Sequence, residues 1–141
     1  MIFSPISAPA NMSINDTQAC FFKFSNDILG SRSQVQNATF GVYIKAPSVP
    51  GVMYTYILVY VLGPPSHHHN HLRQHLIHQK KINLNQEQTM KYYKFDLTRQ
   101  VNNWIKWPDS NWGIKVMASD SQGTPLAIVS PQNPEEEAYV S

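Results

Sequence analysis

Short apolar runs separated by turn-forming residues are the main pattern of this 141-residue chain. The runs are rich in Val, Ile, Tyr and Phe, which is typical of β-strands, and clusters of Gly, Pro, Asn and Asp end them. The strongest run is VMYTYILVYVL, which is followed by Gly-Pro-Pro. The pattern predicts strands at residues 19–24, 39–46, 52–62, 90–97, 112–119 and 126–130, a turn at 120–123, and a further short strand at 138–140.

One segment, residues 97–106, has the periodicity of a helix. Its apolar residues recur at i, i+4, i+7 and i+8, which places them in one stripe. These residues, the expected packing anchors, are Leu97, Val101, Trp104 and Ile105. Asp96 or Thr98 can accept a backbone N–H at the start of the helix, and Pro108 cannot continue it. A helix this short is marginal in isolation and must pack on a sheet.

These elements predict a mainly β fold of the α+β type. The expected architecture is an antiparallel, jelly-roll-like β-sandwich with one amphipathic helix docked near residues 97–106. The length fits one domain. Residues 1–18 are rich in Pro, Ser, Asn and Asp and predict a flexible lead-in, so the domain is expected to span residues 19–141. The polar segment 66–88 has no clear period and predicts a solvated loop.

Composition and charge exclude two classes of partner. Charged residues make up only 14% of the chain and the net charge is +2, which is too weak and too dispersed to predict nucleic-acid binding. No run approaches the ~18 apolar residues of a membrane span, so we expect no membrane insertion.

Six histidines gather in the polar segment, at positions 67, 68, 69, 71, 75 and 78. On a helix, His71, His75 and His78 would share a face and could bind zinc. A catalytic zinc site of the H-E-x-x-H kind would also contain a general base, and the nearest acidic residue is Glu87. A solvated loop is therefore the main expectation, these histidines are weak metal candidates, and no cofactor is predicted.

The single cysteine and the glycosylation sequons are informative about whether the protein is secreted. Because Cys20 is the single cysteine, an internal disulfide framework is excluded. Two states of Cys20 remain open, a half-buried thiol and an interchain disulfide. Three N-x-[ST] sequons, at Asn11, Asn15 and Asn37, lie in predicted loops and favour a secreted glycoprotein.

Two of the three tryptophans flank the predicted turn after the helix. Trp104 belongs to the apolar stripe, whereas Trp107 and Trp112 lie on either side of Pro108. Exposed aromatic clusters often mark interfaces, so this pair is either an interaction surface or local packing.

Residues 101–114, VNNWIKWPDSNWGI, resemble the helix-turn-strand signature of TGF-beta family propeptides. In that signature a helix ending in Trp-Leu/Ile is followed by Pro and then by Asn-x-Gly-Ile/Leu. Residues 20–25, CFFKFS, are similar to the Cys-Cys-Phe-Phe-Lys-Phe segment of the myostatin branch, with Ala19 in place of the first Cys. Residues 57–64 and 118–127 are similar to a long strand and a hairpin of the same branch.

The resemblance implies the arm domain of a secreted growth-factor precursor, and not an enzyme. Such a propeptide assists folding and dimerisation of the mature ligand. After cleavage at paired basic residues it binds the mature growth factor dimer non-covalently and keeps it latent. A homodimeric precursor, an invertebrate source, and a clamp and growth factor outside these residues are further expectations. The alternatives are a carbohydrate- or ligand-binding β-sandwich with Trp107 and Trp112 as a stacking platform, and a metal-dependent enzyme built on the histidines.

Overall fold

The computed structural model describes residues 3–6, 19–24, 34–44, 54–65, 72–83, 91–120, 122, 125–126 and 138–140. In chain order the elements are β1 (Phe3–Ile6), β2 (Cys20–Phe24), β3 (Ala38–Ile44), β4 (Tyr54–Gly63), β5 (Arg73–Asn83), β6 (Lys91–Asp96), α1 (Thr98–Lys106), a 3-10 helix (Pro108–Ser110), β7 (Ile114–Ser119), β8 (Pro125–Leu126) and β9 (Ala138–Val140). The predicted fold class, mainly β with antiparallel strands and one helix, is confirmed.

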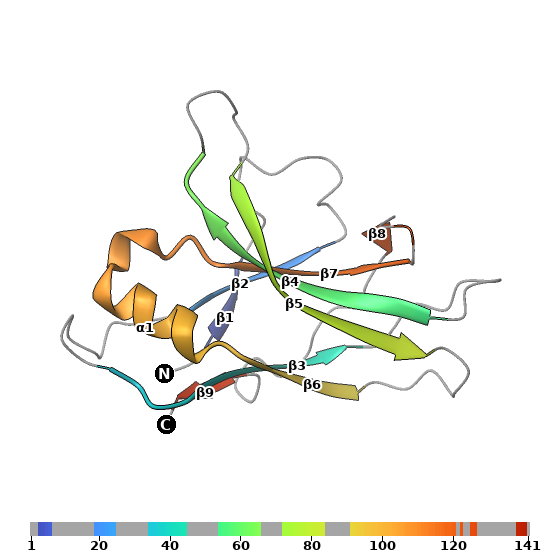
Figure 1. Cartoon of the computed structure of the whole chain (residues 1–141), viewed down its shortest axis with the longest axis horizontal. Helices are drawn as coiled ribbons and strands as arrows, with labels where there is room; N and C mark the ends of the chain where they lie inside the picture. Colours follow the sequence, from blue (N-terminus) through green and yellow to red (C-terminus); the bar gives the residue numbers. More distant parts are fainter. Residues whose placement is uncertain are drawn as a thin grey trace.

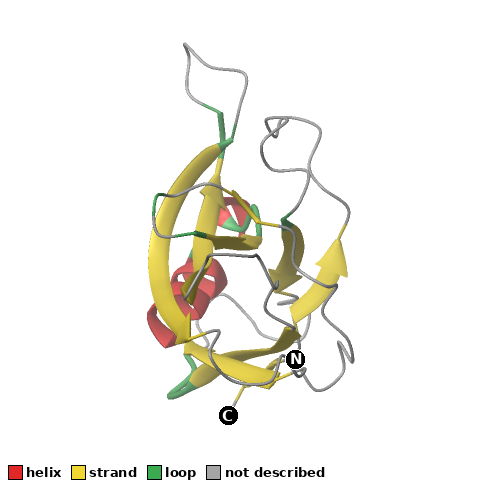
Figure 2. Cartoon of the chain, turned by 90° about the vertical axis from the view of Figure 1, so that its right-hand side faces the viewer, coloured by secondary structure: helices red, strands yellow, loops and turns green. Residues whose placement is uncertain are grey.

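The strands form two antiparallel sheets (Figures 1 and 2). The larger has the order β1-β2-β7-β4-β5, with β8 paired to β7, and the smaller has the order β6-β3-β9. Strand β7 lies in the middle of the larger sheet, where Val116 pairs with Cys20 of β2 on one side and with Val59 of β4 on the other. All six residues of β7 are buried, so this strand is the centre of the fold.

The core between the sheets is built largely from aromatic rings. Phe3 of β1 packs against Phe24 and Phe40, with ring centroids 5.4 and 5.1 Å apart, and against Trp104 of α1 at 5.9 Å. Phe22 and Phe40 lie 5.0 Å apart across the two sheets. Tilted and edge-to-face pairs at these distances are favourable beyond the area that they bury.

Helix α1 is docked through both its apolar stripe and its polar residues. The four stripe residues, Leu97, Val101, Trp104 and Ile105, are each at most 2% exposed. The side chain of Asn102 pairs with the backbone of Val35: Val35 N–H donates to Oδ1 at 2.8 Å, and Nδ2 donates to Val35 O at 3.0 Å. The helix is therefore held to the segment that precedes β3 as well as to the core.

The start of α1 uses both polar residues that the sequence indicated, but in different ways. Asp96 Oδ1 accepts the backbone N–H of Thr98 at 2.9 Å. The hydroxyl of Thr98 donates to the same carboxylate oxygen at 2.6 Å and accepts the N–H of Ala38 at 2.9 Å. Asp96 thus satisfies a donor at the helix start, while Thr98 links the helix to β3.

The corner between α1 and β7 explains the Asn-x-Gly pattern. Asn111 Nδ2 donates to the carbonyl of Phe24 at 2.7 Å, which fastens the corner to β2. Gly113 has φ +97°, and a Cβ at this position would lie 2.7 Å from the carbonyl oxygen of Phe22. Only glycine adopts this conformation and this close approach without strain.

Two expectations about chain organisation are wrong. Within the segment 66–88, expected to be a loop, residues 73–83 form the 11-residue strand β5. Within the expected lead-in 1–18, residues 3–6 form β1, where Phe3 is fully buried. Residues 7–18 and 66–71, like most of the strand expected at 126–130, lie outside the described residues.

Candidate functional site

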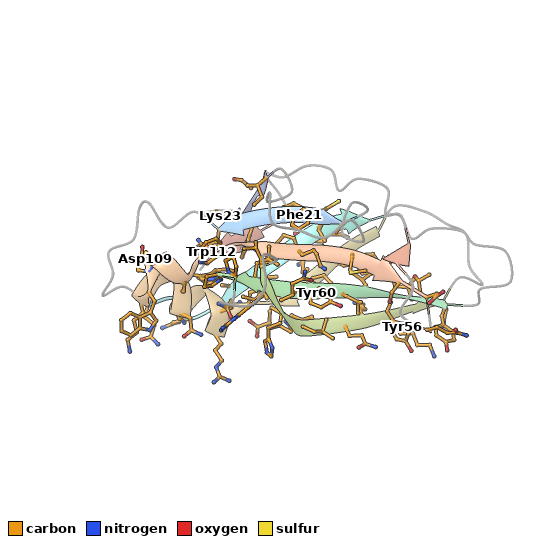
Figure 3. The ribbon with its side chains drawn as sticks, turned by 90° about the horizontal axis from the view of Figure 1, so that it is seen from above. Phe21, Lys23, Tyr56, Tyr60, Asp109 and Trp112 are labelled. Atoms are coloured by element: carbon orange, nitrogen blue, oxygen red, sulfur yellow. The ribbon has the colours of Figure 1, made fainter. Side chains whose placement is uncertain are left out.

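An exposed tryptophan pair lies at the corner that follows α1. Trp107 is 60% exposed and Trp112 is 38% exposed, in contrast to the fully buried Trp104. Figure 3 places Trp112 at the α1 end of the molecule, near Asp109 and opposite the end that carries Tyr56. Both rings therefore keep accessible surface after the chain has folded.

Several contacts hold the corner that carries the pair. The N–H of Ser110 and its hydroxyl both donate to the carbonyl of Trp107, at 2.9 and 2.6 Å. The ammonium of Lys106 lies 5.4 Å from the centroid of the Trp107 ring, which is within cation–π range. Together with the hydrogen bond from Asn111 to β2, these contacts fix the corner from which the two partly exposed rings extend.

A second feature, which we call the α1–β5 cleft, lies between the helix and strand β5. It has a volume of about 400 Å³. Its lining residues are His75, Ile77, His78, Asp96, Leu97, Arg99, Gln100 and Asn103. The sequence did not indicate this cleft, because β5 was expected to be a loop; the only available signal was the polar face of α1.

A hydrogen bond joins two residues that line the cleft. His78 Nε2 lies 2.7 Å from the backbone carbonyl of Asp96, and the His78 ring packs 5.5 Å from that of Phe95. The pKa of the Asp96 carboxyl is held below its ordinary value. The largest cause is the hydrogen bond from the Thr98 hydroxyl, the next is the hydrogen bond from the Thr98 N–H, and the charge of His78 adds a smaller effect. The carboxylate is thus already engaged in hydrogen bonds on the helix side.

The described histidines do not form the helical face that was considered as a weak candidate for zinc. His75 and His78 lie on a strand instead of a helix, and His71 lies outside the described residues. In the part of the chain that the structure describes, no three His, Cys, Asp or Glu side chains are grouped so that they could hold a metal ion. Because residues 73–83 form a strand, His75 and His78 do not share the helical face on which zinc binding was considered.

The cysteine and the sequons are placed as follows. Cys20 is half-buried at the start of β2 and packs against the main core. Asn37 is exposed directly before β3, and its Oδ1 lies 3.4 Å from the hydroxyl of Thr98. Asn11 and Asn15 lie outside the described residues.

Lysine and tyrosine side chains pair on the faces of both sheets, which the sequence did not indicate. The ammonium of Lys81 lies 4.1 Å from the ring centroid of Tyr54, and that of Lys115 lies 4.4 Å from Tyr60. Lys115 is only 3% exposed and also donates to Gln74 Oε1 of β5. In these pairs the tyrosine ring, and not an acidic side chain, is the partner of the lysine ammonium group.

Two further findings bear on the class of protein. Among the helices of the described residues, none has the length and apolar character needed to cross a membrane. A model of the TGF-beta propeptide family matches residues 3–133.

Proposed function

The chain belongs to the TGF-beta propeptide family, and from this premise we propose that it is the arm domain that assists folding and dimerisation of a mature growth factor and then holds it latent. The family consists of the propeptides of secreted growth-factor precursors and is not a family of enzymes. The observation that carries the proposal is the match over residues 3–133, which covers nearly all of the chain. It favours a propeptide over a stand-alone glycan-binding domain or a metal-dependent enzyme.

The exposed tryptophan pair is the surface that we propose for contact with the mature dimer. Trp107 and Trp112 are two of the three large hydrophobic side chains that are exposed among the described residues. Tryptophan is enriched among the residues that dominate binding energy at protein interfaces. The hydrogen bonds that hold the corner lower the entropy lost when these side chains are immobilised by a partner.

The test of this function is a binding measurement with the mature growth factor of the same precursor. The arm domain with Trp107→Ala and Trp112→Ala should bind the mature dimer about tenfold or more weakly, since truncated anchor residues typically cost ~2 kcal/mol. Secretion of the mature dimer from cells that co-express the double variant should fall in parallel. Leu76→Ala, which truncates the third exposed apolar side chain, is the control for a general effect of lost apolar surface. Equal binding by the double variant and the unchanged chain would remove the tryptophans from the interface, and no binding by either would contradict the latency role.

Finer assignments follow from the sequence likeness and form part of the proposal. Residues 20–25 support the myostatin and growth-differentiation-factor branch, and the His-rich segment 67–78, which departs from that branch, fits an invertebrate source. We also propose a homodimeric precursor that is cleaved at paired basic residues. A precursor whose processing is blocked by replacing those basic residues, and which migrates as a dimer in size-exclusion chromatography, would support both points.

The covalent modifications have simple tests. Glycans at Asn11, Asn15 and Asn37 should each be lost on Asn→Gln substitution, with a stepwise mass decrease in the secreted protein. An interchain disulfide through Cys20 should give a dimer on a non-reducing gel that Cys20→Ser abolishes. A monomer on that gel would leave Cys20 as a half-buried thiol.

A further inference from the structure

Strand β5 has an open edge. It pairs with β4 along its whole length, from Arg73 opposite Gly63 to Asn83 opposite Tyr54, and no strand of the described residues pairs with its other edge. An unpaired edge presents a row of N–H and C=O groups that can accept a further strand. Eight of the eleven side chains of β5 are exposed, so its surface is accessible over most of its length.

The two halves of β5 differ in how their edge is protected. The second half carries Lys80 and Lys81, and the register with β4 shifts between Val59 and Tyr60, so that Ile77 is the extra residue of a bulge. Lysines and bulges on an edge strand discourage pairing with another chain. The His78–Asp96 hydrogen bond adds a bridge from the strand to the start of the helix. The first half, residues 73–76, lies before the bulge and contains no lysine.

One face of this first half borders the α1–β5 cleft. His75 pairs with Val61, which packs against the main core, so His75 lies on the inner face of the sheet. Across the cleft, α1 contributes Arg99, Gln100 and Asn103. The one acidic side chain of the lining, Asp96, already accepts two hydrogen bonds from Thr98. The cleft therefore offers a guanidinium, an imidazole and two carboxamides, a set that suits a carboxylate.

The other face of the first half carries Gln74, whose Oε1 accepts a hydrogen bond from Lys115, and the apolar Leu76. Leu76 is 40% exposed and pairs with Tyr60, which lies on the outer face of β4 (Figure 3). The charged residues of the strand also favour an acidic occupant. Residues 72–83 contain Arg73, Lys80 and Lys81 and no acidic residue. An occupant of this edge would thus meet basic groups on the inner side and an apolar side chain on the outer side.

We propose that the first half of β5 accepts an extended acidic peptide segment as an additional strand. Alternate side chains of the segment are acidic and enter the α1–β5 cleft, and the side chains between them are apolar and pack on Leu76. Main-chain hydrogen bonds supply affinity in this mode of recognition, and alternate side chains supply specificity. The inference goes beyond the proposed function and does not depend on it, because it concerns a different surface from the tryptophan corner.

The test uses a defined peptide, acetyl-Thr-Glu-Val-Glu-Val-Glu-Thr-amide, and the whole chain labelled with ¹⁵N. The acidic peptide should bind saturably and shift the backbone amide resonances of residues 73–77 more than those of residues 79–83. A peptide with Lys in place of each Glu should bind at least tenfold more weakly, which corresponds to ~1.4 kcal/mol. Equal affinity for the two peptides, or shifts that are largest outside β5, would overturn the proposal.

Two methylated peptides test the strand pairing itself. One carries N-methyl groups on its valines and the other on its glutamates, so each lacks one alternate set of N–H donors. Only one set of donors faces β5 in a paired strand. One methylated peptide should therefore lose binding while the other retains it. If both bind as the parent peptide does, main-chain pairing is excluded.

Matched charge variants separate the cleft from general electrostatics. Arg99→Gln should weaken binding of the acidic peptide by about tenfold, or ~1.4 kcal/mol. Lys23→Gln makes the same change of charge at an exposed position of β2 (Figure 3) and should leave binding unchanged. Equal weakening by both variants would overturn the site, because the effect would then follow net charge alone. Both positions are exposed, and unchanged melting temperatures confirm that the variants are folded.

Discussion

Gly113 is the residue whose conformation most constrains the corner between α1 and β7. Its φ of +97° disfavours every L side chain, and a Cβ would approach the carbonyl oxygen of Phe22 to 2.7 Å. Gly113→Ala should lower the free energy of unfolding by about 2–4 kcal/mol, since the strain and the backbone contact add. Urea denaturation measures this loss.

The matched control for this prediction is Gly63 at the end of β4. A Cβ there would meet its nearest neighbour, the Cβ of Arg73, at an ordinary 3.7 Å. Gly63→Ala should change the free energy of unfolding by less than about 1 kcal/mol. Comparable losses in the two variants would show that the corner is not specially constrained.

The tryptophans of this region should differ sharply in their contribution to stability. Trp104 is fully buried and lies 5.9 Å from Phe3 and 6.1 Å from Phe24, ring centroid to ring centroid. Trp104→Ala should cost about 3–5 kcal/mol of folding free energy. Trp107→Ala, at a 60% exposed position, should cost about 0.5 kcal/mol or less. Thermal denaturation separates them, and an unchanged melting temperature for the Trp104 variant would contradict docking of the helix.

At the scale of elements, α1 and β5 show what the sequence can and cannot reveal. Helix α1 was predictable because its buried face repeats at helical spacing, from Leu97 to Ile105. Strand β5 was not, because most of its side chains are exposed and its sequence, RQHLIHQKKIN, has no alternation. The tryptophan corner could be anticipated from the residues around Pro108. The α1–β5 cleft could not, because it exists only when β5 is present.

The start of α1 should depend on pH through Asp96. Hydrogen bonds from Thr98 and the charge of His78 lower the pKa of this carboxyl in the folded state. The carboxylate therefore stabilises the fold above the ordinary Asp pKa of about 3.9, and this contribution is lost as the pH falls through the lower folded-state value. Asp96→Asn should lower the melting temperature at pH 7 and have a smaller effect near pH 2.

The control for this pH dependence is Asp109→Asn, in the exposed 3-10 helix at the other end of α1. It removes the same charge from a position outside the hydrogen bonds at the helix start. Melting curves of the unchanged chain and both variants at the two pH values give the comparison. A loss for Asp96→Asn that is equally large at both pH values would assign the effect to the amide side chain and not to the carboxylate.

At the scale of the whole molecule, strand order was the least predictable property. Alternating patterns identify strands but carry no information about which strands pair. Thus β2 pairs with β7, and β3 pairs with both β6 and β9, although long stretches of chain separate several of these partners. Packing between the two sheets, such as Phe22 against Phe40, also joins distant parts of the chain and forms only when the sheets face each other.

The position of β7 predicts a gradient of local stability. Its backbone is paired on both sides, to β2 and β4, and all of its side chains are buried. Its amides should therefore exchange with solvent only through global unfolding, whereas edge strand β5 should exchange through smaller openings. Hydrogen exchange followed by mass spectrometry should show the slowest exchange in β7 and β4. Faster exchange in β7 than in β5 would contradict this description of the core.

The bond between Asn111 and Phe24 has a consequence for how the protein is made. It joins residues 87 positions apart, and the pairing of β2 with β7 spans a similar length of chain. Contacts this distant are slow to form, on a scale of milliseconds to seconds. During synthesis, Phe21 and Phe22 leave the ribosome long before Lys115 and Ile114 of β7, with which they pair. A newly made chain therefore passes through a period with an exposed aromatic strand, in which chaperone binding would protect it from aggregation.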